Sequence, residues 1–146
     1  MTADRRRGRG LLDTSTVILL PHIVDPGQLP AEPTISAITL AELTVGPLVA
    51  RTDEERAARQ AHLQQAEADF EPLPFDAAAA RAIGRVAASL RRAGRKPAAR
   101  AYDAMIAAVA VANELSLYTC NPDDFAGIEH LDLVPVPHPG GAPAGS

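Results

Sequence analysis

Short apolar runs alternate with segments of helical spacing along this chain, and the alternation leaves few folds open to it. The strand candidates are residues 10–13, 117–120 and 131–136. Helix candidates lie between them, and one has apolar residues at i, i+3, i+4 and i+7, namely Ile83, Val86, Ala87 and Leu90. Strands that alternate with helices favour a parallel sheet. The sequence therefore predicts an α/β fold, with a mainly parallel central sheet and helices on both faces.

Capping and helix-breaking residues suggest where some helices begin and end. Thr52 is followed by Glu55 three residues later, a capping box that predicts the start of a polar helix reaching about residue 69. Asp76 is suitably placed to cap the next helix. Gly46-Pro47 should interrupt the helix that begins near Thr39.

The chain of 146 residues has room for one domain of ordinary size, and no internal repeat or linker divides it. Residues 1–9 carry four arginines and few apolar side chains, so we expect a flexible arm. Residues 137–146 are rich in Pro, Gly and Ala and have little to bury, so we expect a disordered tail. The folded body is then residues 10–136.

Cysteine usage and hydropathy suggest a compartment. Cys120 is the single cysteine, so no internal disulfide can form, and its apolar neighbours favour a buried thiol over a nucleophile. No apolar run reaches the roughly 18–20 residues that cross a membrane. Asp13 also interrupts the apolar run that follows the basic N-terminus, which argues against a signal peptide. We therefore expect a cytoplasmic protein with no membrane partner.

Four carboxylates stand where the pattern predicts burial. They are Asp13, Glu42, Asp103 and Asp124. Ligand sites of parallel sheets form at the carboxyl ends of the strands. Buried, unpaired charges there would cost several kcal/mol, and a divalent cation would offset them. Because oxygen donors select Mg²⁺ or Mn²⁺ over zinc, we expect a site for one of these ions.

Each acid also has a purely structural interpretation. Asp13 could cap the following helix, and Asp124 could cap a turn. Glu42 could lie at a rim with its stem packed, and Asp103 could sit in a first turn favoured by the helix dipole. The residues alone leave the two interpretations about equal. The histidines show no metal-ligand spacing and are expected on the surface or in loops: His22, His62, His130 and His138.

Four short segments are informative because of their amino-acid sequences and their order along the chain. They are Leu11-Leu12-Asp13-Thr14-Ser15, Ile38-Thr39-Leu40-Ala41-Glu42-Leu43, Asp103-Ala104-Met105-Ile106-Ala107-Ala108 and Thr119-Cys120-Asn121-Pro122-Asp123-Asp124-Phe125. Together they resemble the motifs of the PIN-domain ribonucleases, particularly the VapC-type toxins of prokaryotic toxin–antitoxin pairs. The resemblance covers residues 11–136.

The resemblance implies roles for individual residues. The implied catalytic and metal-binding acids are Asp13, Glu42, Asp103 and Asp124. Ser15 and Thr119 are implied as hydroxyls that support these acids, and Asn121 as an orienting amide. Some family members carry Asp where Asn121 stands, so the fourth ligand is Asn121, Asp124 or neither directly. The arginine-rich extension is also longer than the family commonly has.

The resemblance also implies an activity and partners. The activity is that of a type II toxin, a Mg²⁺-dependent endoribonuclease (Mn²⁺ could replace Mg²⁺) that cleaves RNA phosphodiesters with a metal-activated water. The products would carry 5′-phosphate and 3′-hydroxyl ends. A carboxylate, with Glu42 as the first choice, would orient the water, and the alternative role of Glu42 is that of a metal ligand. The implied partners are a VapB-type antitoxin and a second copy of the chain. Residues 43–49 and 53–69 are candidate partner surfaces, or simply pack on the sheet.

Basic residues gather before the third acid. They are Arg91, Arg92, Arg95, Lys96 and Arg100. We interpret them as an RNA-binding rim, because phosphate contacts need Lys and Arg. The alternative is a solvated helix end, where cations favour the dipole. The arginines of the N-terminal arm could serve RNA or only solubility.

Two other functions remain open at this point. One is a catalytically silent PIN-fold module that binds an antitoxin or RNA. The other is a phospho-acceptor receiver-like domain, which needs a lysine beside its acids, whereas the single lysine, Lys96, lies in a predicted loop. The net charge of −4, from 18 acidic and 14 basic residues, argues against a uniformly basic nucleic-acid binder. The four candidate acids equal that whole excess, so the rest of the chain is neutral.

Overall fold

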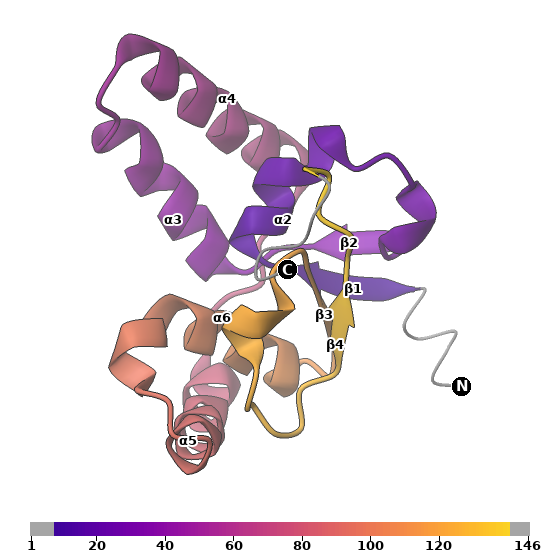
Figure 1. The fold of residues 1–146 in the computed structure, drawn as a ribbon, viewed down its shortest axis with the longest axis vertical. Helices are drawn as coiled ribbons and strands as arrows, with labels where there is room; N and C mark the ends of the chain where they lie inside the picture. Colours follow the sequence, from indigo (N-terminus) through magenta and orange to yellow (C-terminus); the bar gives the residue numbers. More distant parts are fainter. Residues whose placement is uncertain (1–7, 141–146) are drawn as a thin grey trace.

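A computed structural model describes residues 8–140, and their centre is a four-stranded parallel sheet (Figure 1). The strands, in spatial order, are β2 (Glu32–Thr34), β1 (Arg9–Leu12), β3 (Ser116–Thr119) and β4 (Leu133–Pro135). The predicted α/β class and parallel sheet are confirmed. Residues 1–7 of the predicted arm and 141–146 of the predicted tail lie outside the described residues.

Within residues 8–140, five α-helices and four short 3₁₀ helices connect the strands. The α-helices are α2 (Thr14–Leu19), α3 (Ala37–Leu48), α4 (Asp53–Asp69), α5 (Ala77–Arg92) and α6 (Ala101–Ala112). The 3₁₀ helices are η1 (Leu20–His22), η2 (Pro26–Gln28), η3 (Pro97–Arg100) and η4 (Pro122–Phe125). No helix among residues 8–140 is long and apolar enough to cross a membrane.

The two central strands are apolar because both of their faces are covered. Leu11 pairs with Leu117 and Leu12 with Tyr118, and all four are buried. Gly10 permits a close approach at the start of β1. A Cβ atom there would lie 2.5 Å from the Tyr118 ring and 2.9 Å from Pro30, so a side chain would push the strand out of place.

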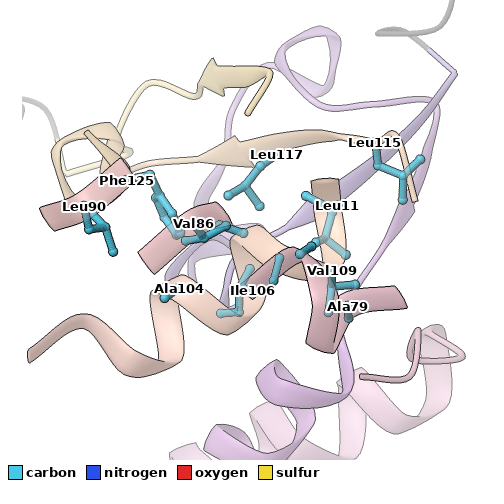
Figure 2. Close-up of a cluster of buried hydrophobic side chains, with 14 residues drawn as sticks. Leu11, Ala79, Val86, Leu90, Ala104, Ile106, Val109, Leu115, Leu117 and Phe125 are labelled. Atoms are coloured by element: carbon cyan, nitrogen blue, oxygen red, sulfur yellow. The ribbon is translucent and has the colours of Figure 1, made fainter. Parts of the chain in front are cut away.

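Helices cover both faces of the sheet, as predicted. On one face, α5 and α6 pack against β1 and β3, and Figure 2 shows side chains from all four elements gathered in one cluster. The buried members include Leu11, Val86, Ile106 and Leu117. On the other face, Leu12 and Tyr118 meet side chains of α2, α3 and α4. Helices α3 and α4 form a hairpin that projects from the sheet (Figure 1).

The predicted helix starts are confirmed, but one predicted interruption is wrong. The Thr52 hydroxyl accepts a hydrogen bond from the Glu55 N–H at 3.0 Å, and Asp76 caps α5 through the Ala79 N–H at 3.0 Å. Pro47, in contrast, lies within α3, which continues to Leu48. Pro47 is buried in the last turn, so its ring adds apolar packing where only one hydrogen bond is lost.

Candidate active site

Asp13 is the most deeply buried acid of the candidate site, with 4% of its surface exposed. It follows β1 directly, and its carboxylate accepts from the Thr16 N–H at 3.1 Å, the Ser15 hydroxyl at 3.2 Å and the Thr119 hydroxyl at 2.7 Å. The Thr16 hydroxyl donates to it as well. Asp13 therefore caps α2, as one interpretation predicted, and also lies at the carboxyl end of the central strands, as the other predicted.

Burial and hydrogen bonding act on Asp13 in opposite directions. Burial raises the pKa of this carboxyl, and the bonds from Thr16, Thr119 and Ser15 lower it without offsetting the burial. A buried carboxylate with several donors has a fixed orientation. Asp13 is thus a rigid, partly desolvated group.

Glu42 lies on α3 and points toward the same region. Its Oε1 accepts a hydrogen bond of 2.7 Å from the Thr14 hydroxyl, which lies 3.0 Å from the buried Thr39 hydroxyl. Burial raises the pKa of Glu42, and the negative charge of Asp13 adds to this. The carboxylate is half-buried and oriented by a chain of two threonines.

Asp103 is in the first turn of α6, and its electrostatic environment includes the other three acids. Burial raises its pKa to about 6, with further contributions from Asp124, Glu42 and Asp13, in that order. Arg100 acts in the opposite direction. Such like-charge effects require nearby groups, so the four acids share one region although they come from four separate segments.

Asp124 completes the group from η4. Its Oδ1 lies 3.1 Å from Nη1 of Arg100, and both side chains are partly exposed. Asn121 does not reach the acids directly: its Nδ2 donates to the Ser15 hydroxyl at 2.9 Å, and that hydroxyl donates to Asp13. Its backbone N–H donates to the Thr119 hydroxyl at 2.9 Å. Asn121 therefore orients the Ser15 and Thr119 hydroxyls, two of the three that donate to Asp13.

The oxygen donors at this site are chemically suited to a hard cation, but their separations are larger than those of metal ligands. Within residues 8–140, no three His, Cys, Asp or Glu side chains lie close enough to hold a metal ion as they stand. The candidate acids offer only oxygen atoms, the donors that Mg²⁺ and Mn²⁺ prefer. Their mutual repulsion at Asp103 is the electrostatic situation that a cation relieves.

The sequence profile of the PIN domain matches residues 11–131, which includes all four acids. This chain belongs to the PIN-domain family. It is 40% identical over 129 residues to ribonuclease VapC5 of Mycobacterium tuberculosis, a match covering 87% of this chain and 93% of the relative. It is 33% identical over 130 residues to ribonuclease VapC4 of the same organism, covering 88% and 97%.

A solved structure agrees with this assignment. The crystal structure of a VapBC toxin–antitoxin family member, VapBC-5 of M. tuberculosis, contains a chain 38% identical to this one with a TM-score of 0.76. The match covers 88% of this chain and 99% of that chain. The predicted VapC-type PIN fold is confirmed, and the receiver-like alternative is wrong because the fold is that of a different family.

The basic residues of the predicted RNA-binding rim of this PIN domain fall into two groups, those that make contacts within the protein and those that do not. Arg92 pairs with Glu129 at 2.9 Å, Arg100 pairs with Asp124, and Arg95 donates to the backbone carbonyls of Asp123 and Ala126 at 2.9 and 3.1 Å. The exposed side chains of Arg91 and Lys96 make no hydrogen bond or ion pair within residues 8–140. Arg95 and Arg100 thus fasten the loop that carries Asp124.

Thr14, Thr16 and Thr39 are the site residues of this PIN domain that the sequence reasoning missed. Thr16 donates to Asp13, and its hydroxyl also accepts from the Cys120 N–H at 3.0 Å, which ties α2 to the end of β3. A signal existed in the sequence. Three hydroxyl residues directly follow the strand-ending Asp13, where hydroxyls can hydrogen-bond a buried carboxylate.

Proposed function

We propose that this protein is the ribonuclease toxin of a VapBC-type toxin–antitoxin pair and that it hydrolyses RNA phosphodiester bonds with the aid of Mg²⁺. The relatives named ribonuclease VapC5 and VapC4 support the reaction class. The observation that carries the proposal is that four acids from separate segments share one region, where burial and the other three acids raise the pKa of Asp103 to about 6. Perturbed acids grouped in one region are typical of catalytic sites.

Mg²⁺ fits the chemistry of this region, with Mn²⁺ as a substitute. Asp13, Glu42, Asp103 and Asp124 would hold the ion through carboxylate oxygens, and Asn121 would act through the Ser15 and Thr119 hydroxyls. Because no three of these groups lie at ligating separation in the described chain, binding would draw the acids closer together. When bound, the ion lowers the pKa of a water and neutralises charge developing on the phosphate.

The chain's own residues would supply orientation and proton transfer. Asp13 is held by Thr16, Ser15 and Thr119, so its oxygens need no reorganisation during the reaction. Glu42 is oriented by Thr14 and has a raised pKa, which brings a carboxylate nearer the range useful for a general base. In our proposal Glu42 orients the attacking water and accepts its proton.

We also propose that the protein binds a VapB-type antitoxin and forms a homodimer. The solved VapBC-5 structure is described as a toxin–antitoxin system, which supports the first partner. In this proposal the antitoxin's tail occupies the acid site, so binding prevents cleavage. Exposed apolar residues near the end of α3, Val45, Leu48 and Val49, support a contact with a second protein chain.

A cleavage assay on cellular RNA tests the nuclease proposal. Wild-type protein should cut RNA with Mg²⁺, lose activity in EDTA, and leave 5′-phosphate ends. Asp13→Asn and Asp103→Asn should each abolish cleavage, while Asp53→Asn, which changes an exposed acid on α4, should not. Full Mg²⁺-dependent cleavage by either of the first two variants would refute the proposed site, and antitoxin binding without any cleavage would favour a silent module.

A further inference from the structure

A cavity of about 260 Å³ opens beside the acid site between α2, α3 and α4. Thr14 and Glu42, the hydrogen-bonded pair of the site, form one part of its lining. Arg59 and His62, one turn apart on α4, form another part. The cavity therefore places a guanidinium and an imidazole beside the carboxylate that we propose orients the attacking water.

Arg59 is held in place by contacts that leave donors free. Its Nη1 donates to the Gly46 carbonyl at 3.0 Å, and its Nη2 donates to Glu55 at 3.1 Å. The aliphatic stem packs over Gly46, where a Cβ atom would lie 3.4 Å from it. A guanidinium has five N–H donors, and these two bonds use only two of them. Arg59 thus keeps N–H groups for a further acceptor.

His62 has no partner within residues 8–140. It was expected on the surface or in a loop, but it is half-buried on a helix and lines this cavity as well as a neighbouring one of about 500 Å³. Neither ring nitrogen makes a hydrogen bond in the described chain. Its ring is thus available to stack on a base or to bond with one.

We infer that this cavity binds one nucleotide of the RNA substrate adjacent to the phosphate that is cut. The inference rests on the proposed function and names a subsite for it. Arg59 would offset phosphate charge beside the acids, and His62 would contact the base or ribose. The volume is just below the roughly 300–1,000 Å³ of drug-sized pockets, which suits a single base rather than a longer segment.

Two features favour RNA over a segment of a partner protein. The cavity shares Thr14 and Glu42 with the acid site, so its occupant lies next to the reacting bond. Its other polar groups are a cation and an aromatic ring, which recognise a phosphate and a base. The larger neighbouring cavity lacks a cation and is lined mainly by apolar groups such as Val17, Leu20 and Phe70.

The test compares His62→Ala with His22→Ala, which alters an exposed histidine in η1, and Arg59→Ala with Arg56→Ala, which alters an exposed arginine on the same helix. In His62→Ala, loss of one base contact should raise KM for a short RNA roughly five- to a hundred-fold, and kcat should change less. His62→Ala should also relax the nucleotide preference at one position beside the cut, as read by sequencing product ends. Both control variants should match wild type.

A second measurement does not depend on cleavage. The His62 ring resonances are followed by NMR while each of the four nucleoside 5′-monophosphates is added to wild-type protein. A shift that is absent with inorganic phosphate supports the subsite, and this holds even if wild-type protein cuts no RNA and the proposed function fails.

Three results would overturn the inference. One is an active wild type whose KM and cut sites are unchanged by His62→Ala, which would leave the proposed function intact. Another is an inactive wild type whose His62 resonances respond to no nucleotide. The last is unchanged cleavage by His62→Ala together with weaker antitoxin binding, which would assign the cavity to the protein partner.

Discussion

Arg100 and Asp124 lie 3.1 Å apart, and the pair joins the start of α6 to η4. The side chains of Arg100 and Asp124 are 33% and 44% exposed, so the pair adds little to stability. Its larger effect is electrostatic. Arg100 lowers the pKa of Asp103, opposing the effects of burial and of the neighbouring acids. A residue expected to bind RNA thus also lowers the pKa of one acid of the site, although burial and the other acids have larger effects.

Replacing Arg100 should therefore change the pKa of Asp103. In Arg100→Ala, we expect the pKa of Asp103 to rise above its value of about 6, because the variant removes a cation that lowers it. Carbon-detected NMR titration of the Asp103 carboxyl measures this in metal-free buffer. Arg92→Ala removes an equal charge from an exposed pair with Glu129 and should leave the pKa of Asp103 unchanged. An equal shift of this pKa in both variants would contradict a local effect of Arg100.

The unpaired basic residues should act differently from the paired ones. Removing Arg91 and Lys96 together should weaken RNA binding without changing Tm, because their side chains support no contact in the described chain. If each contacts one phosphate of single-stranded RNA, the slope of log K against log[salt] should fall by about 1.4. Arg81→Ala with Arg85→Ala removes the same charge from earlier in α5, and an equal loss of slope there would argue against a localised rim.

The stability of the metal-free protein should fall as pH rises through the titration of Asp103. Its folded pKa of about 6 lies above the ordinary 3.8, so the folded state holds a proton that the unfolded chain has released. The stabilising contribution is complete below about pH 4 and is lost by about pH 6. Asp103→Asn should flatten the fall in Tm over this window and be more stable than wild type at pH 7, measured in EDTA.

The exposed Asp53→Asn provides the comparison for that measurement. It removes one acid from the first turn of α4 without touching the site. A Tm profile of Asp103→Asn that parallels wild type between pH 4 and 6 would show that burial of Asp103 carries no pH-dependent cost.

Thr14 should matter for the rate of cleavage more than for folding. Thr14→Val keeps the side-chain shape but removes the hydroxyl that donates to Glu42. Hydrogen bonds to charged groups contribute about 1.5–3 kcal/mol, so kcat should fall roughly ten- to a hundred-fold. Thr44→Val is the matched variant on α3, where the hydroxyl donates only to the Leu40 carbonyl. Equal kcat in the two variants would remove Thr14 from the site.

Two glycines of the α5 region should respond to alanine in opposite directions. Gly84 lies within α5, and a Cβ atom there would meet nothing within 4 Å. Gly84→Ala should raise the free energy of unfolding by about 0.5–1 kcal/mol. Gly94 follows the helix with a φ of +77°, a left-handed conformation that costs alanine about 1–2 kcal/mol. Urea denaturation measures both, and stabilisation by Gly94→Ala would contradict this backbone argument.

The positions of the acids were predictable because burial is visible in a sequence. Asp13 ends an apolar strand and Asp103 opens an apolar helix, and the sheet topology then brings such segments together at one edge. The roles of the four acids as metal ligands stay a prediction. The sequence also predicted that Asn121 would orient a neighbour, and its bond to the Ser15 hydroxyl agrees with that role.

The orientation of side chains was not predictable in the same way. The spacing of Arg95 and Arg100 shows that they are basic, but not that they turn toward η4, because that depends on how α6 and the last strands pack. The threonines of the site were missed for a related reason. Thr14 and Thr39 are 25 residues apart, and only the packing of α2 against α3 makes them neighbours. The prediction that the helix is interrupted at Pro47 was wrong because burial of the proline ring outweighed its local helix-breaking effect.

The hydrogen bond from Thr119 to Asp13 spans 106 residues and so sets an order of events during translation. At roughly 5–20 residues per second, Thr119 is synthesised about 5–20 s after Asp13. A nascent chain without β3 has neither this hydroxyl nor the strand that pairs with β1. The acid site can thus form only after β3 has been synthesised and has left the ribosome, so a shorter nascent chain does not carry the complete site.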